Sequence, residues 1–376
     1  MRFLTADYLY TLTDEPIKKG VLQVDDSGKI INIYRETSDV PSNKIDFYKG
    51  VLCPGFINAH CHLELSHLKE SAEKTKGFSD FLSIIQKRNK FSKQKILSAI
   101  ENSDNEMIKN GIVGVGDICN TVDTLFQKSK SKIQYYNFIE TFEVNTDKSK
   151  EAISLALIIR EKFRSNNLQA TISPHAPYSV TPNLMKAISD LSDNLDFVFS
   201  IHNQETQHEN ILFEQKEGEF YNWLCRLNAS SEIWEKRSSS SNIIKELNTE
   251  KRILFVHNTY SRSSDLTDEY YCTCPNANLF IEQRLPDYSI FNSDYLCVGT
   301  DSLASNHNLS IINELSHIQK NSNYNLETLL KIACRNGARA LGFNNLGTFE
   351  IGKRPGVNLI SDYNFGLESA SITKII

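Results

Sequence analysis

Histidine and aspartate side chains follow four separate apolar segments of this chain. His60 and His62 stand two residues apart after the first segment, and His202, His257 and Asp301 follow three later ones. Residues i and i+2 of a β-strand point to the same face, so His60 and His62 direct their imidazoles at one point. Each residue taken alone is typical of a buried core histidine or a helix cap. Because four strand ends carry such residues, we predict a divalent metal site with one position left for water, and the expected ligands are His60, His62, His202 and Asp301.

A carboxylate beside these residues indicates acid–base chemistry. Glu205 follows His202 by three residues, on the turn that leaves an apolar segment. From there a carboxylate can reach a metal-bound water without binding the metal, as a general acid or base must. The alternative is a charge that favours a helix N-terminus, and that interpretation suits Glu209 better than Glu205.

From residue 51 onward, apolar segments alternate with amphipathic helices. This alternation is typical of βα units and a parallel sheet, and eight units fit a closed (β/α)8 barrel. Such barrels place their sites where the strands end, so His175, after the fourth strand, joins the same rim. The expected strands are residues 51–58, 111–118, 133–139, 169–173, 197–201, 253–256, 270–273 and 295–298. The expected helices are residues 78–90, 94–110, 148–165, 182–191 and 326–341.

The two chain ends have a different texture, with short apolar runs separated by turn signals. Neither end has enough core alone, so we expect them to complete one small sheet together. The predicted domains are a composite domain from residues 1–50 and 345–376 and a barrel from residues 51–344. Two segments look inserted: residues 77–93, expected to cover the barrel mouth, and residues 228–242, expected to be a surface loop.

The composition is ordinary for a soluble globular protein. Among 376 residues, 41 Lys and Arg face 46 Asp and Glu, which gives a formal net charge of −5. This charge, with scattered basic residues, argues against nucleic acid or an anionic membrane as the partner. No transmembrane helix or signal peptide is expected. The eight cysteines are expected to be reduced thiols, with Cys272 and Cys274 as a buried pair, which favours a cytoplasmic protein.

Six short motifs follow one another along the chain around the residues named above: His60-x-His62, Ser173-Pro174-His175-Ala176-Pro177-Tyr178-Ser179, His202-x-x-Glu205-Thr206-x-x-Glu209, Val256-His257-Asn258, Gly299-Thr300-Asp301-Ser302 and Leu346-Gly347-x-x-x-x-Gly352-Lys353. Their types and order resemble the amidohydrolase superfamily over essentially the whole chain. Within it, the chain is most similar to the branch of mononuclear-metal deaminases and chlorohydrolases. The resemblance implies a (β/α)8 TIM barrel with a small composite β-sandwich domain from the two chain ends.

The same resemblance implies a role for each matched residue. The implied ligands of one divalent metal ion per chain, zinc before iron, are His60, His62, His202 and Asp301. Glu205 and Asp301 become proton shuttles, His257 orients the hydrolytic water, and His175 faces the substrate. Two positions stand out. Gln204 stands where the branch often has Ala, and its role is unassigned. His175 stands where dinuclear members keep a carbamylated lysine, which favours a single metal.

The segment His62-Leu63-Glu64-Leu65-Ser66 resembles the aminodeoxyfutalosine deaminases, which act on a purine nucleoside derivative, and it places Glu64 at the substrate. The expected function is therefore hydrolytic deamination of an aminated purine-like ring. A metal-bound hydroxide attacks the ring carbon that carries the amino group, Glu205 protonates the adjacent nitrogen, and ammonia leaves. The expected partner is a small-molecule substrate, and a homodimer is common in similar proteins.

Three other functions compete with this one. A hydrolase on the same scaffold would cut a cyclic amide or a carbon–halogen bond. A catalytically inactive scaffold protein would have lost ligands, whereas this chain keeps all of them. The small zinc deaminases share the His-x-Glu of His62-Leu63-Glu64 but need a Pro-Cys-x-x-Cys segment, which this chain lacks.

Overall fold

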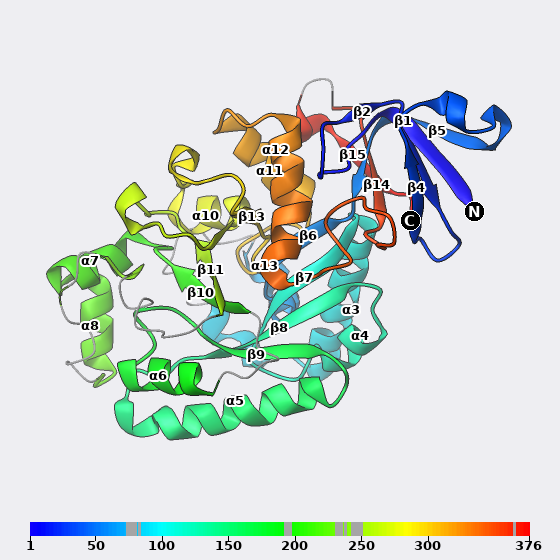
Figure 1. The fold of residues 1–376 in the computed structure, drawn as a ribbon. Coiled ribbons are helices and arrows are strands. Elements are labelled where there is room, and N and C mark those ends of the chain that lie inside the picture. Colours follow the sequence, from blue (N-terminus) through cyan, green and yellow to red (C-terminus); the bar gives the residue numbers. More distant parts are fainter. Residues whose placement is uncertain are drawn as a thin grey trace.

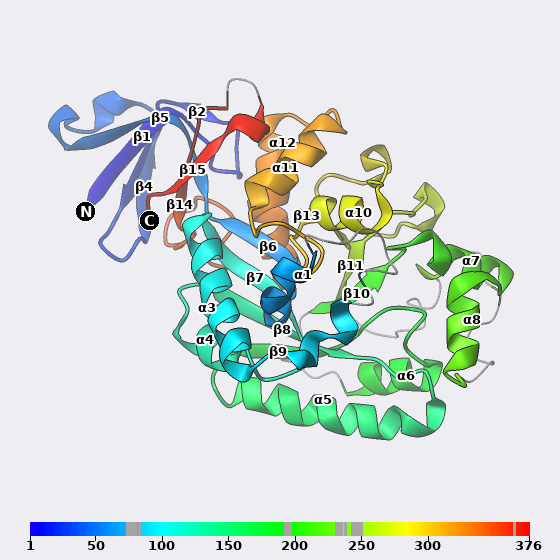
Figure 2. The ribbon, with the colours of Figure 1, turned by 180° about the vertical axis from the view of Figure 1, so that it is seen from behind.

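The computed structural model describes residues 1–72, 81, 84–191, 198–229, 236, 239–241, 251–363 and 366–376. They form an α/β body with parallel strands, and a mixed sheet at one corner contains both chain termini (Figures 1 and 2). Within these ranges, no helix has the length and apolar character needed to cross a membrane.

The body contains eight parallel strands in two four-stranded sheets, ordered β6-β7-β8-β9 and β10-β11-β12-β13. No side chain of β6 or β10 is exposed, as expected for strands covered on both faces. The strands are β6 (Phe56–Cys61), β7 (Ile112–Cys119), β8 (Gln134–Thr141), β9 (Gln169–Pro174), β10 (Val198–Asn203), β11 (Arg252–His257), β12 (Tyr270–Thr273) and β13 (Leu296–Val298). The parallel α/β fold predicted from the alternation of strands and helices is confirmed.

Backbone hydrogen bonds join the two sheets at both of their edges. Between β9 and β10, the N–H of His202 donates to the carbonyl of His175 at 2.9 Å. Between β13 and β6, the carbonyl of His60 accepts from the N–H groups of Thr300 and Asp301, each at 3.1 Å. Both junctions therefore lie at predicted site residues.

The expected first strand, residues 51–58, is wrong. β5 (Ile45–Pro54) belongs to the sheet of the chain ends, and β6 begins a new sheet at Phe56. Pro54 has no N–H with which to continue a ladder. At Gly55 the chain passes so near β7 that a Cβ would lie 2.5 Å from Val113 Cγ1. The apolar run of residues 51–58 conceals this change of sheet.

The two chain ends form one seven-stranded sheet, which confirms the expected shared sheet. Its order is β15-β14-β5-β1-β3-β4, with β2 paired to β1, and β14 from the C-terminal end pairs antiparallel with β5. The remaining strands are β1 (Arg2–Leu9), β2 (Ile17–Lys18), β3 (Val21–Val24), β4 (Ile30–Tyr34), β14 (Val357–Ser361) and β15 (Ser371–Lys374). The β-sandwich stays a prediction.

The helices lie on the outside of the parallel strands, as α5 does beside β8 and β9 (Figure 1). The helices expected at residues 94–110, 148–165, 182–191 and 326–341 are confirmed, and a π-helical stretch, Lys331–Asn336, joins the two parts of the last one. The helices are α1 (Lys69–Ala72), α3 (Lys93–Lys109), α4 (Leu125–Lys130), α5 (Ser149–Arg164), α6 (Pro182–Asp190), α7 (Gln207–Gln215), α8 (Gly218–Arg226), α10 (Pro275–Glu282), α11 (Ile311–Lys320), α12 (Leu326–Leu330) and α13 (Gly337–Leu341).

Two predicted segments fall partly outside the described residues. The expected helix of residues 78–90 and the covering segment of residues 77–93 include undescribed positions, and so does the expected loop of residues 228–242.

The thiols of Cys272 and Cys274 are free and buried, as expected.

The junction between β13 and β6 should tolerate no added side chain at Gly299. A Cβ there would lie 2.7 Å from the carbonyl oxygen of His60 and 2.8 Å from its nitrogen. We expect Gly299→Ala to lower the free energy of unfolding by about 1–3 kcal/mol through overpacking, measured by denaturant titration. The comparison variant is Asn102→Ala, at an exposed position of α3. An unfolding free energy for Gly299→Ala at or above that of Asn102→Ala would contradict the close packing of this junction.

Candidate metal and catalytic site

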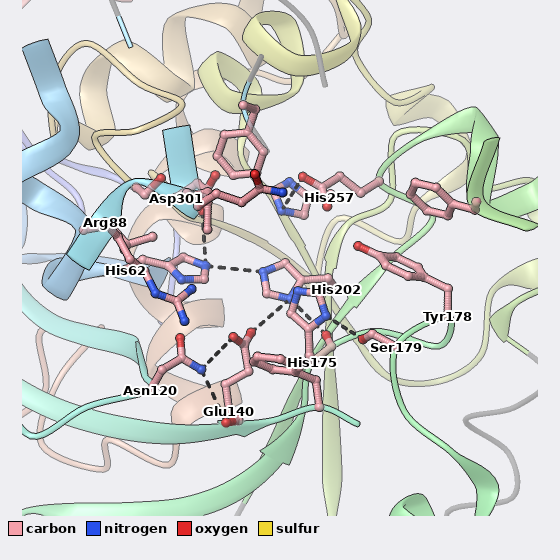
Figure 3. A pocket seen from close by; sticks show the side chains of 18 of the residues that line it. His62, Arg88, Asn120, Glu140, His175, Tyr178, Ser179, His202, His257 and Asp301 are labelled. Atoms are coloured by element: carbon pink, nitrogen blue, oxygen red, sulfur yellow. Dashed lines mark hydrogen bonds and ion pairs between the residues drawn. The ribbon is translucent and has the colours of Figure 1, made fainter. Parts of the chain in front are cut away.

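The predicted metal-binding residues lie together at the ends of three strands, and His257 joins them from the end of a fourth. Figure 3 shows the side chains of His62, His202, His257 and Asp301 turned toward one another at the end of a cavity. His60 is fully buried and does not line the cavity. The sequence therefore predicted correctly which side chains converge.

The closest contacts within the cluster are between imidazole Nε2 atoms and a carboxylate oxygen, which are atoms that can bind a metal ion. Nε2 of His62 lies 3.1 Å from Nε2 of His60 and 3.3 Å from Nε2 of His202. Oδ1 of Asp301 lies 3.5 Å from Nε2 of His60 and 3.3 Å from Nε2 of His62. Three imidazole nitrogens and one carboxylate oxygen thus point at a common centre.

Left-handed backbone conformations turn two of the strand ends toward this centre. His257 has a φ of 73° and Asp301 a φ of 55°, and both are residues with a Cβ. Non-glycine residues adopt this region at a conformational cost, and such residues concentrate at functional sites. At Asp301 the cost is offset by hydrogen bonds, because its N–H donates to His60 and its Oδ2 accepts from the hydroxyl of Ser305.

Hydrogen bonds fix the tautomers of two histidines. The ring Nδ1 of His202 lies 2.9 Å from the carbonyl oxygen of His175, which can only accept, so Nδ1 carries the proton. Nδ1 of His257 donates in the same way to the side-chain oxygen of Asn278 at 2.8 Å. In the neutral rings Nε2 is then left as an acceptor that faces the cavity, as a metal ligand or a water-orienting base requires.

Burial sets the charge of the cluster. Removal from water lowers the pKa of His60 and of His62 to about 3, so both rings are neutral at pH 7. Burial alone would raise the pKa of Asp301, but its hydrogen bond with His60 and the neighbouring His62 and His257 hold that pKa well below its usual range. His60 and His62 therefore bring neutral nitrogen donors to the cluster, and Asp301 brings a carboxylate charge.

This donor set fits a divalent cation. Ligands at about 2.0–2.2 Å from a tetrahedral ion lie roughly 3.3–3.6 Å from one another. The four contacts given above between the donor atoms are 3.1–3.5 Å long. Nε2 of His202 faces the other donor atoms as an acceptor, because Nδ1 of its ring carries the proton. The geometry thus explains why neutral histidines and an aspartate are buried together here.

Glu205 lies beside the cluster but not in it. Its Oε1 is 3.6 Å from Nε2 of His257, and its side chain is almost fully buried. Burial raises the pKa of Glu205 to about 7, so the carboxyl group can both accept and release a proton near neutral pH. These properties are those of a general acid or base.

The structure shows what Gln204 does, which its sequence context left open. Its backbone has a φ of 47° and its N–H donates to the carboxylate of Glu209 at 3.0 Å. Its amide donates to Asp265 at 3.0 Å and accepts from the hydroxyl of Ser261. Gln204 therefore ties the turn that carries Glu205 to the loop after β11.

His175 and Glu64 lie at different depths. His175 lines the cavity, and its Nδ1 is 2.6 Å from the hydroxyl of Ser179. The carboxylate of Glu64 instead accepts hydrogen bonds from the backbone N–H groups of Asn120 and Thr121 at 3.0–3.2 Å and from the Thr121 hydroxyl at 2.9 Å. A contact of Glu64 with substrate stays a prediction, whereas its hold on the turn at Asn120 is observed.

The cavity has a volume of about 470 Å³, within the usual range for small-molecule sites. One wall is aromatic, with Tyr178, Phe220 and Trp223, and the opposite wall is polar. The polar wall contains Arg88, Asn120 and Glu140, which were not predicted from the sequence. Asn120 directly follows β7, and Glu140 is the second-last residue of β8. Both therefore lie at strand ends, as the predicted site residues do, and could have been predicted in the same way. Phe220 and Trp223 carried no comparable signal.

Comparisons with known proteins agree with this site. Residues 51–376 match the model of the amidohydrolase family. An adenosine deaminase of Helicobacter pylori is 28% identical over 339 residues, which cover 85% of this chain and 81% of that protein. An aminodeoxyfutalosine deaminase of a Nitratiruptor species is 25% identical over 328 residues, 83% of this chain and 79% of that protein. The structure of Helicobacter pylori aminofutalosine deaminase with methylthio-coformycin superposes with a TM-score of 0.80 at 25% identity, over 96% of this chain and 92% of that one.

The cluster should bind one divalent cation per chain. We expect elemental analysis of the purified protein to give close to one equivalent, and His202→Ala to release it because one of the converging nitrogens is lost. The matched control is His307→Ala, an exposed histidine outside the cavity, which should keep the metal. Two tightly bound ions per chain would contradict the single centre.

The raised pKa of Glu205 should make stability depend on pH. An acid whose folded pKa is about 7 against an ordinary 4.5 binds more protons when folded, so it lowers the free energy of unfolding as pH rises through that window. In chelator-treated protein, Glu205→Gln should therefore gain stability over wild type at pH 8, by up to a few kcal/mol, and lose this advantage at pH 4.5. Glu101→Gln, at an exposed position, should show no such trend. A constant difference between pH 4.5 and 8 would disprove the raised pKa.

Proposed function

Because the chain belongs to the amidohydrolase family, we propose that it is a metal-dependent hydrolytic deaminase of an aminated purine-like ring. The observation that carries the proposal is the cluster of three histidine nitrogens and one aspartate oxygen at the end of a cavity that Glu205 also lines. The deaminases among its relatives support the same reaction class.

The proposed ligands of one metal ion are His60, His62, His202 and Asp301. Zinc is the first candidate because nitrogen and carboxylate donors suit it, and iron is the second. A bound cation would act as a Lewis acid and lower the pKa of a coordinated water toward neutrality.

The protein's own groups then move the protons. Nε2 of His257 accepts a hydrogen bond from the attacking water, because Nδ1 of this ring is committed to Asn278. Glu205 takes one proton from the water and delivers it to the ring nitrogen beside the reacting carbon. The water oxygen bonds to that carbon, Asp301 passes the second proton to the amino group, and the carbon–nitrogen bond breaks to release ammonia.

The proposal extends to the substrate and to the whole fold. Aminodeoxyfutalosine, which the name of one relative includes, is the first candidate substrate. We propose that the two parallel sheets close into a (β/α)8 barrel, since hydrogen bonds join both pairs of edges. The composite β-sandwich domain, the homodimer and the cytoplasmic location stay predictions, and residues 51–54 belong with the composite sheet.

Glu205→Gln should remove activity without removing the metal. The carboxamide keeps the size of the side chain but cannot deliver a proton, so kcat should fall by roughly 10²–10⁴-fold while metal content and ligand affinity are largely retained. Ammonia release should be measured with adenine nucleosides, aminodeoxyfutalosine, guanine and cytosine. Turnover of the variant within about tenfold of wild type would reject the deaminase mechanism and favour cleavage of a cyclic amide or a carbon–halogen bond.

A further inference from the structure

Glu140 presents a buried carboxylate oxygen to the cavity without a partner. It lies near the end of β8, and its side chain is 7% exposed. Its Oε2 accepts a hydrogen bond from the side-chain amide of Asn120 at 3.0 Å. Its Oε1 is buried and has no hydrogen-bond partner among the described residues. A buried acceptor without a hydrogen bond lowers the stability of the folded protein. We therefore expect a bound molecule to supply the donor to this oxygen.

The orientation of Glu140 is fixed by the residues behind it. Glu64 holds the backbone of Asn120 and Thr121 through the hydrogen bonds described above, and Asn120 in turn holds Oε2 of Glu140. The side chain is therefore positioned by a built network rather than by chance.

The neighbouring groups of the protein do not supply the missing donor. Nδ1 of His202 is 3.5 Å from Oε1 of Glu140, but its proton is committed to the carbonyl of His175 at 2.9 Å. Arg88 lines the same wall, yet no ion pair joins it to Glu140 in the described structure. Oε1 is thus available to a donor on a bound molecule.

The position of Glu140 limits which part of a substrate it can reach. Figure 3 shows Asp301 and His257 on one side of His202 and Glu140 on the other. The amino group that leaves must lie with Asp301, His257 and Glu205. An adenine ring substituted at N9 has no second N–H group, so a donor that reaches Glu140 must come from the substituent.

We propose that Glu140 is a specificity-determining residue that accepts a hydrogen bond from a sugar hydroxyl, so that the substrate is a purine nucleoside or nucleoside derivative and not a free base. This inference rests on the proposed deaminase function, since that function places the ring. Glu64 and Asn120 serve it as positioning residues.

Dissociation constants measured on a variant that cannot turn over test the contact of Glu140 with the sugar independently of catalysis. Dissociation constants for adenosine, 2′-deoxyadenosine, 3′-deoxyadenosine and adenine are measured by calorimetry on metal-loaded Glu205→Gln protein, with and without Glu140→Gln. We expect adenosine to bind about tenfold or more tightly than at least one deoxynucleoside, and Glu140→Gln to weaken adenosine by about tenfold and abolish this preference. Adenine should change less than about threefold. Glu143→Gln, the same change three residues along the chain and outside the cavity lining, should alter none of these values.

Three outcomes would overturn the inference: equal weakening of adenine and adenosine, an unchanged preference between adenosine and both deoxynucleosides, or loss of metal from Glu140→Gln, which would assign Glu140 to the support of His202. Failure of the proposed function has a different signature. Wild-type protein would then release no ammonia from any purine, whatever the dissociation constants show.

Discussion

The carbonyl oxygen of His60 accepts two backbone hydrogen bonds, from the N–H groups of Thr300 and Asp301, and the arrangement of the site depends on them. They join the last parallel strand to the first, although the residues are some 240 positions apart in the chain. The side chain of Asn58 reinforces the junction, with its amide donating to the Thr300 hydroxyl at 2.7 Å and its oxygen accepting from the Thr300 N–H at 3.0 Å. Asp301 can face His60 and His62 only because this junction exists.

Polar groups deeper in the body support the same geometry. The carboxylate of Asp117, paired with the buried Lys128, accepts the N–H of Leu63 at 2.8 Å and so fixes the turn directly after His62. Glu314 accepts from the amide of Asn306 at 2.7 Å, and that amide also donates to the carbonyl of Thr300 at 2.8 Å. Buried charges are tolerated when they are paired and hydrogen-bonded, and Asp117 meets both conditions. Glu314 is held by hydrogen bonds from Asn276 and Asn306. These hydrogen bonds hold in place the turn after His62 and the backbone at Thr300, next to the site residues. Catalysis by a preorganised site requires such support.

The sequence predicted those parts of the molecule whose signal is local. The spacing of His60 and His62, and the apolar run before each of His202 and His257, were enough to place these side chains at one rim. The change of sheet at Gly55 was missed because an apolar run does not reveal which neighbour its strand pairs with. Glu140 could have been found at a strand end, but the roles of Gln204 and Glu140 could not be predicted, for another reason. Their roles depend on partners far away in sequence or adjacent only in the fold, such as Asp265 and Asn120.

We propose that four side chains from three strand ends, those of β6, β10 and β13, hold one cation. Anomalous diffraction from a crystal of the metal-loaded protein tests it directly. We expect one peak per chain, at about 2.0–2.2 Å from Nε2 of His60, His62 and His202 and from a carboxylate oxygen of Asp301. A single peak between Glu140, His175 and His202, whose ligand atoms also lie within 4.8 Å of one another, or two peaks per chain, would contradict it.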